Sequence, residues 1–255
     1  MIQKKKSNIT ILFFTVFLAG CSPTANEDQL SVDDAPIEGV VQTKSTVGLP
    51  PYASDSNSQY NIAMTYVETQ DYINAFEWFN RAADQGNAKA QHMLCGMYLE
   101  GIGINQDYEK ALDLCKKSAS QGDVNAQDLM GLIYYEGRVV DQDYFEALEW
   151  FNKAADQGSD DSQLKLCTMY AEGQGVRQDQ SKAFEWCKKS SAEGNIYAGF
   201  NLGLMYLTGQ GVSQDTSTAK DLFGTACDNG IQEGCDQYKR LNFDNTQHAV
   251  QFYPS

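Results

Sequence analysis

The sequence has few of the residues on which enzyme and metal sites usually depend. Histidine occurs only twice, at His92 and His248, and the chain has no closely spaced cysteine pair or cysteine–histidine cluster of the kind that holds zinc. His-Glu-x-x-His, Gly-x-Ser-x-Gly and the phosphate-binding loop are also missing. We therefore expect no metal, no cofactor and no conventional catalytic site.

Basic residues are scarce as well. The chain has 19 Lys and Arg against 34 Asp and Glu, which gives a net charge of −15. Such a protein repels nucleic acid phosphates and anionic lipid surfaces, so nucleic acid is excluded as a partner. A basic partner would be favoured, although an acidic surface often serves solubility alone.

Long apolar stretches are missing too. The apolar core of the N-terminus, Ile9–Leu18, is too short to span a bilayer. It follows the basic residues Lys4, Lys5 and Lys6, and together they predict an export signal.

Glycine, in contrast, recurs at a fixed interval along most of the chain. Successive members of one series are 36 residues apart: Gly86, Gly122, Gly158, Gly194 and Gly230. Three further series keep this interval: Tyr98, Tyr134, Tyr170 and Tyr206; Asp107, Asp143, Asp179 and Asp215; Ala111, Ala147, Ala183 and Ala219. A period of this size indicates a repeat array, and such arrays present extended binding surfaces.

The sequence of each unit in the array predicts a helical hairpin. Apolar residues at helical spacing predict one helix over residues 88–100, and Gly101 and Gly103 permit the positive φ of a helix C-terminus. Asp107 is expected to cap a second helix that ends before Gly122. The apolar side of the hairpin is buried only when neighbouring units stack.

The repeated motifs resemble the Sel-one-like repeat, a relative of the tetratricopeptide repeat. They include Met130-Gly131-Leu132-Ile133-Tyr134, Gly173-Gln174-Gly175-Val176 and Ala147-Leu148-Glu149-Trp150. The resemblance covers residues 54–242 and implies an all-α solenoid of about five helix-turn-helix repeats and a C-terminal capping helix over 231–241. The first unit departs from the pattern because it lacks the Gly-rich loop. Residues 243–255 are expected to form a non-periodic tail.

The segment Leu18-Ala19-Gly20-Cys21 resembles a bacterial lipobox. The resemblance implies removal of residues 1–20 and attachment of lipid to Cys21, and Ser22 then favours the outer membrane. We expect a periplasm-facing lipoprotein, with residues 21–53 as an acidic flexible tether. The alternative is an ordinary cleaved signal peptide followed by an incidental cysteine.

The six remaining cysteines predict three disulfides, since export places them in an oxidising compartment. Cys95 and Cys115 are 20 residues apart, as are Cys167 and Cys187. Other units have a small residue at the first of these positions and Phe at the second. Two core positions that touch are expected to show such an exchange of volume, because interiors are close-packed. Cys227 and Cys235 would join the last hairpin to the cap, as in the cysteine-rich secreted branch of the resembling family. A metal site and free thiols are the alternatives.

Residues that break the repeat pattern are the candidates for binding. We expect the following side chains on the first helix of each hairpin to form a binding face: Lys89, His92, Tyr135, Lys165 and Tyr197. The recurring Tyr and Trp residues are expected to be core instead. An ordinary solvated face is the alternative for the variable positions.

The expected function is a protein–protein interaction module, lipid-anchored in the cell envelope. The family resemblance implies a scaffold or adaptor, with an immunity protein that masks an exported toxin as one form of it. The alternative is a weak β-lactamase or a binder of penicillin or cell-wall peptides, suggested by the family and by two Ser-x-x-Lys segments, Ser162–Lys165 and Ser217–Lys220. The companion motifs of serine β-lactamases are missing. The oligomeric state does not follow from the sequence.

Overall fold

The computed structural model describes the backbone of residues 54–250 and the side chains of residues 54–243. Within this range the chain forms eleven α-helices and no strand. The helices are α2 (Ser56–Glu68), α3 (Tyr72–Asp84), α4 (Ala88–Glu100), α5 (Tyr108–Ser120), α6 (Val124–Glu136), α7 (Tyr144–Asp156), α8 (Asp160–Glu172), α9 (Gln180–Ala192), α10 (Ile196–Thr208), α11 (Thr216–Asp228) and α12 (Gln232–Val250). No helix in this range is long and apolar enough to cross a membrane.

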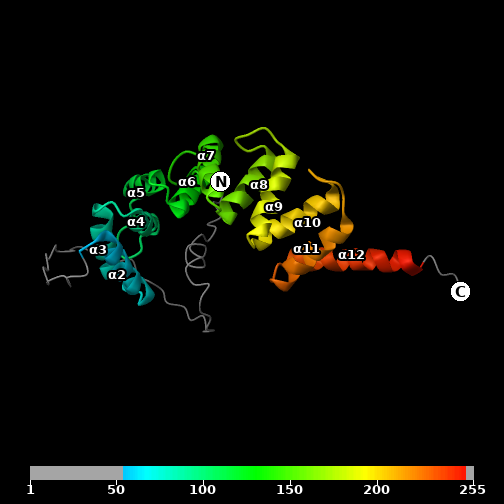
Figure 1. The fold of residues 1–255 in the computed structure, drawn as a ribbon, viewed down its shortest axis with the longest axis horizontal. Helices are drawn as coiled ribbons and strands as arrows, with labels where there is room; N and C mark the ends of the chain where they lie inside the picture. Colours follow the sequence, from blue (N-terminus) through cyan, green and yellow to red (C-terminus); the bar gives the residue numbers. More distant parts are fainter. Residues whose placement is uncertain (1–53, 251–255) are drawn as a thin grey trace, which may run out of the picture. The chain divides into compact units, whose positions relative to one another are not determined.

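The helices pair in chain order. Each of α2, α4, α6, α8 and α10, here called first helices, packs against the second helix that follows it (Figure 1). Each second helix then packs against the first helix of the next unit, and α6 also approaches α8. The all-α solenoid of five hairpins with a final helix, as expected from the sequence, is confirmed.

Caps at both ends set the length of each helix. Asp107, Asp143, Asp179 and Asp215 accept backbone N–H groups at the start of the second helices, as the sequence predicts for Asp107. At the other end, Gly101 and its counterparts close the first helices with φ between 66° and 76°, a conformation that costs little only for glycine. The fixed positions of these residues explain why ten helices have 13 residues each.

The first unit is connected differently, as its sequence indicates. Its two helices are joined by Thr69, Gln70 and Asp71 without a Gly-rich loop. Gln70 has φ of 59° and is the one non-glycine residue with positive φ in the described range. The short connection therefore gives a positive φ to a residue with a side chain, whereas the other connections use glycine for this conformation.

The interior of the units alternates between two types of contact. In the second and fourth units, disulfides join Cys95 to Cys115 and Cys167 to Cys187, with Cα atoms 5.4 and 5.1 Å apart. In the third unit a Cβ added to Gly131 would lie 2.6 Å from the Phe151 ring, so the ring fills the space directly above the glycine. These are the two pairings that the exchange of Cys with small residue and Phe predicts.

A further substitution accompanies this alternation. The disulfide units have buried serines, and Ser118 Oγ donates a hydrogen bond to the Ala88 carbonyl oxygen at 2.7 Å. Ser190 Oγ donates to the Asp160 carbonyl oxygen in the same way, also at 2.7 Å. The units with Phe have Ala82, Ala154 and Ala226 at this position. Each serine hydroxyl thus ties the end of a second helix to the start of the first helix of its own unit.

The recurring Tyr and Trp residues pack against the core. Tyr134 and Trp186 contact the buried cluster around Phe151, and Tyr206 contacts the next one. A cation from the same helix lies over the ring of each Trp; Lys153 Nζ, for example, is 4.0 Å from the centre of the Trp150 ring. Packing therefore accounts for these aromatic residues.

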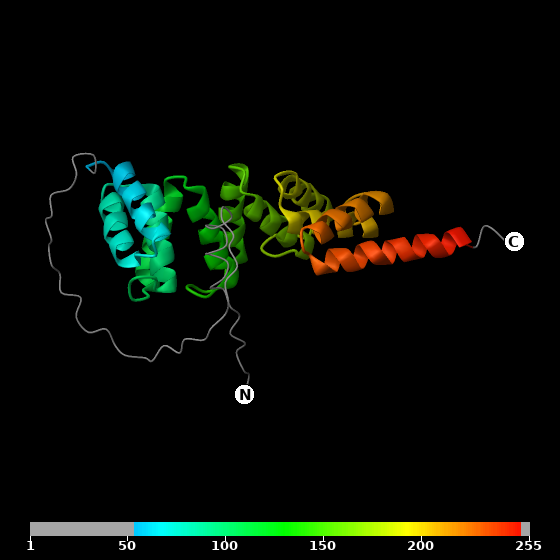
Figure 2. The ribbon, with the colours of Figure 1, turned by 90° about the horizontal axis from the view of Figure 1, so that it is seen from below.

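The last helix is longer than expected. The sequence suggests a cap over 231–241 and a tail from 243, but α12 continues to Val250, with its N-terminal part packed on α11 (Figure 2). No Pro or Gly occurs between Gly234 and Pro254, so nothing in the backbone stops the helix. Cys227 and Cys235 join α11 to α12 by the third disulfide.

The proposed signal peptide, Cys21 and the tether over 21–53 lie outside the described residues, as do residues 251–255.

Candidate functional site

All five candidate binding residues lie on first helices. Lys89 and His92 are on α4, Tyr135 on α6, Lys165 on α8 and Tyr197 on α10. Lys89 is exposed and Tyr197 is 66% exposed, whereas the other three are partly buried. We call these five residues the candidate face.

The structure brings two of them together. Lys165 Nζ lies 5.3 Å from the centre of the Tyr135 ring, across the boundary between the third and fourth units. The same ring makes edge contacts with Tyr144 and Phe151, at centroid distances of 5.3 and 6.2 Å. Burial raises the pKa of the Tyr135 hydroxyl. The Lys165 cation is therefore held against an aromatic surface anchored in the core.

A polar pair next to this contact was not predicted from the sequence. The hydroxyl of Ser162 on α8 donates a hydrogen bond to the carboxylate of Asp128 on α6. Ser162 is fully buried, and burial of Asp128 raises the pKa of its carboxyl to about 6. The hydrogen bond from Ser162 and the charge of Lys165 act in the opposite direction, and Asp161 and Asp160 add to the increase.

A signal for this pair is present in the repeat. Ser162 occupies the position of Ala90, Ala126 and Ala198, which are all fully buried. A lone hydroxyl in a row of buried alanines requires a hydrogen-bond partner. Asp128, at the position of His92, Leu164 and Phe200, supplies it.

The two Ser-x-x-Lys segments do not form nucleophile–base pairs. Ser162 Oγ is buried and donates to Asp128, while Lys165 lies over Tyr135. Ser217 lies in the first turn of α11, where its backbone N–H donates to Asp215, and Lys220 Nζ lies 5.5 Å from the Tyr238 ring centre. No observation here favours the β-lactamase or penicillin-binding alternative.

His92 is a partly buried helix-face residue. Its Nδ1 atom is buried without a hydrogen-bond partner. Burial lowers the pKa of the imidazole, and the charge of Asp123 acts in the opposite direction. A neutral ring is the form that this environment favours.

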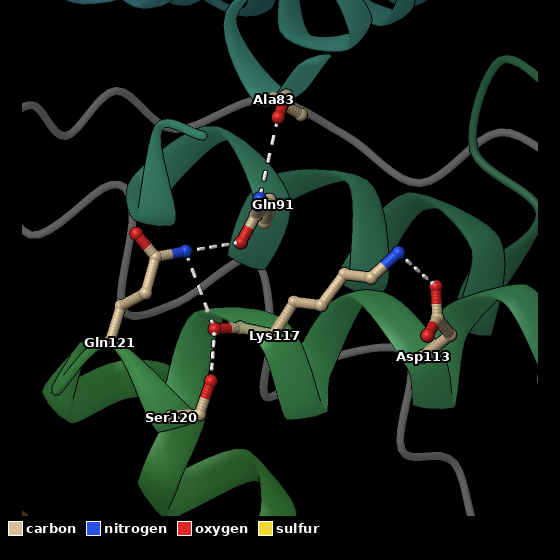
Figure 3. A network of polar contacts seen from close by, with 6 residues as sticks. All are labelled: Ala83, Gln91, Asp113, Lys117, Ser120 and Gln121. Atoms are coloured by element: carbon tan, nitrogen blue, oxygen red, sulfur yellow. Dashed lines mark hydrogen bonds and ion pairs between the residues drawn. The ribbon is translucent and has the colours of Figure 1, made fainter. Parts of the chain in front are cut away.

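A row of glutamine pairs runs along the units. In the second unit, Gln121 Nε2 at the end of α5 donates to Gln91 Oε1 on α4 at 2.7 Å, and Gln91 Nε2 donates to the Ala83 carbonyl oxygen of α3 at 3.3 Å (Figure 3). The pair Gln157 and Gln127 repeats the contact in the third unit at 2.7 Å, and Gln85 and Gln59 make it in the first at 2.8 Å. We call this row the glutamine ladder.

Metal ligands do not converge in the described part of the chain. Within residues 54–243, no group of three or more His, Cys, Asp or Glu side chains is arranged to hold a metal ion. The six described cysteines are all in disulfides.

The fold defines an α-helical repeat protein of stacked helical hairpins. Five consecutive segments match the Sel1 repeat family: residues 56–87, 88–123, 124–159, 160–195 and 196–231. The chain therefore belongs to the Sel1 repeat family, the family that its repeated motifs resemble. Sel1 repeats mediate protein–protein interactions, and proteins built from them are generally non-enzymatic scaffolds.

Solved structures agree with this assignment. The chain is similar to a protective antigen of uropathogenic Escherichia coli with the same repeat fold, at 32% identity and a TM-score of 0.70 over 73% of this chain. It corresponds to 41% of the length of that antigen. A Sel1 repeat protein from Oxalobacter formigenes is similar at 27% identity and a TM-score of 0.68, over 73% of this chain and 76% of the other. No curated protein matches the chain in sequence.

Proposed function

We propose that this protein is a lipid-anchored scaffold or adaptor of the bacterial cell envelope and that it binds its protein partner on the candidate face. The observation that carries this proposal is the difference between two sets of positions. Packing positions repeat from unit to unit, whereas Lys89, Asn125, Asp161 and Tyr197 occupy one equivalent position with four different side chains. Packing does not fix this position, so its side chains can differ from unit to unit to suit one particular partner.

Tyr197 supports this interpretation most directly. It is 66% exposed on α10, and a large aromatic side chain that is not needed for the core is typical of an interface anchor. Lys89, Lys165 and Tyr197 lie on three different first helices. A partner that contacts all three would span four units, as the extended surface of a repeat array allows.

The proposed location is the periplasmic side of the outer membrane. Its support is the lipobox-like segment that ends at Cys21 and the following Ser22. Three disulfides within the described residues are also typical of an oxidising compartment.

Site-specific photo-crosslinking in the native host tests the proposal. A photoreactive phenylalanine would replace Tyr197 or Lys89 on the candidate face and, as controls, the exposed residues Glu149 or Lys188 on second helices. We expect one defined protein adduct from the candidate face and none from the controls. Identification of the adduct would distinguish an envelope scaffold from an immunity protein, whose partner would be a toxin. Equal adducts from both faces would contradict the proposed face.

A further inference from the structure

The glutamine ladder is interrupted in the fourth unit. Gln163 on α8 is only 5% exposed, and its Nε2 donates to the Ala155 carbonyl oxygen at 3.3 Å, as in the preceding units. Its Oε1 atom, however, is buried without a hydrogen-bond partner. The residue that would supply the donor is Glu193 at the end of α9, where the second and third units have Gln121 and Gln157.

Turning the Gln163 amide does not remove this deficit. The opposite orientation would direct Nε2 towards Glu193, but it would place Oε1 against the Ala155 carbonyl oxygen. In that orientation Gln163 Oε1 and the Ala155 carbonyl oxygen would face each other as two acceptors. In the orientation observed, the Glu193 carboxylate has no proton to donate to Gln163 Oε1. In either orientation this position lacks one donor, and a buried acceptor without a donor is costly.

Further negative charge gathers at the same turn. Asn195, two residues after Glu193, donates through Nδ2 to Asp160 Oδ2 at 3.0 Å and to Asp161 Oδ1 at 3.2 Å. Desolvation, followed by the charge of Asp160, raises the pKa of the Asp161 carboxyl, and Lys165 acts in the opposite direction. None of the ion pairs in the described range includes Asp160, Asp161 or Glu193.

The ladder itself shows what the missing group has to supply. In the second unit the Gln121 side chain provides an N–H at 2.7 Å from Gln91 Oε1 (Figure 3). In the fourth unit a ligand would have to donate an N–H to Gln163 Oε1 and neutralise Glu193. A guanidinium does both, because it is cationic and carries five N–H donors in a fixed plane. A metal ion fits less well, since the described carboxylates do not converge as ligands.

We propose that the turn at Glu193 binds an arginine side chain of a basic segment in the protein partner, through Glu193, Gln163 Oε1 and the adjacent carboxylates Asp160 and Asp161. Glu193 is exposed, so its side chain can move aside while the guanidinium takes the position that Gln121 Nε2 has in the second unit. The net charge of −15 favours a basic segment as the ligand. This inference rests on the proposed function and adds the chemistry of the partner.

The test uses the full oxidised chain in non-ionic detergent, labelled with ¹⁵N. The probe is N-acetyl-L-arginine amide, and N-acetyl-L-citrulline amide is the neutral control of nearly the same shape. We expect arginine to produce saturable shifts in the Gln163 side-chain amide and the Glu193 backbone amide, with at least tenfold weaker binding of citrulline. Equal binding of both probes, or no saturable shift with arginine, would overturn the inference.

Two variants make the test specific. Glu193→Gln restores the internal donor, so we expect it to abolish arginine binding and at the same time to raise the urea midpoint of unfolding. Glu185→Gln, which removes the same charge from an exposed position of α9, should change neither. Arginine binding that survives in Glu193→Gln would contradict the inference. If the arginine probe fails but the crosslinked partner still binds on the candidate face, only this inference is wrong and the proposed function stands.

Discussion

Ser162 on α8 donates a hydrogen bond to the Asp128 carboxylate on α6, and so joins the first helices of two neighbouring units through a buried polar contact. Ser162 interrupts a row of buried alanines, since alanine fills its position in three other units. The contact therefore distinguishes the boundary between the third and fourth units from the other boundaries. It lies beside Lys165 of the candidate face, whose charge stabilises the ionised carboxyl.

Asp128 should make stability depend on pH. Its carboxyl has a pKa of about 6 in the folded chain and an ordinary value of 3.8, so the folded state binds the proton more tightly. Stability should therefore fall as pH rises from 4 to 6, by up to about 3 kcal/mol. Asp128→Asn should remove this fall and stabilise the protein at pH 7. Urea unfolding of both proteins at several pH values measures it.

The control for this experiment is Asp113→Asn. The Asp113 side chain is 62% exposed and pairs with Lys117, so its effect should be within about 0.5 kcal/mol at all pH values. If Asp128→Asn and Asp113→Asn follow the same pH profile, the Asp128 carboxyl does not have the environment described.

The two types of interior contact should be interchangeable. Cys115→Phe alone places a ring against Cys95 and should destabilise the second unit by about 1–3 kcal/mol relative to the reduced wild type. Adding Cys95→Gly reproduces the Gly131 and Phe151 pair and should relieve the overpacking. Thermal unfolding under reducing conditions gives the coupling energy from a double-mutant cycle. Additive effects would show that the two positions do not share one space.

The glutamine ladder should contribute to stability. Gln121→Glu removes the donor to Gln91 Oε1 and leaves a buried acceptor unpaired, with an expected loss of about 1–3 kcal/mol at pH 7. The loss should shrink below pH 4, where the protonated carboxyl can donate. Asn125→Glu, an exposed position with the same change in charge, is the matched control. Equal losses from both variants would assign the effect to charge alone.

The proposed anchor makes a separate prediction. Cys21→Ala should abolish incorporation of radiolabelled palmitate and move the protein from the membrane fraction to the soluble fraction, because no acylated cysteine remains. Ser22→Asp should keep the lipid but shift the protein from the outer to the inner membrane. Unchanged membrane association of Cys21→Ala would rule out the lipid anchor.

The repeat interval explains why so much of the fold follows from the sequence. Tyr98, Gly101 and Asp107 return with the same spacing in the next three units, so the helix ends predicted for one unit hold for the others. The cysteine pairs follow from the same comparison, since Gly131 and Phe151 show which positions touch.

Contacts that occur once are harder to predict. Ser162 and Asp128 meet only because α8 lies against α6, and a repeat pattern does not say which side of a first helix faces the next unit. The unpaired Gln163 Oε1 is similar: the rows Gln91, Gln127, Gln163 and Gln85, Gln121, Gln157 both recur in the sequence, but the sequence does not show that their side chains meet. The extension of α12 past residue 242 depends on where helix propagation stops, and periodicity carries no information on that point.

The central claim is that the first helices bind a protein, and the most direct measurement is the affinity of the partner recovered by crosslinking. Isothermal titration would compare the oxidised wild type with Tyr197→Ala and with Phe145→Ala, an exposed aromatic residue on the second helix α7 that is 72% exposed. We predict that Tyr197→Ala weakens binding at least tenfold without changing the unfolding temperature, and that Phe145→Ala binds as the wild type does. Unchanged affinity in Tyr197→Ala together with a loss in Phe145→Ala would place the interface on the opposite helices and contradict the claim.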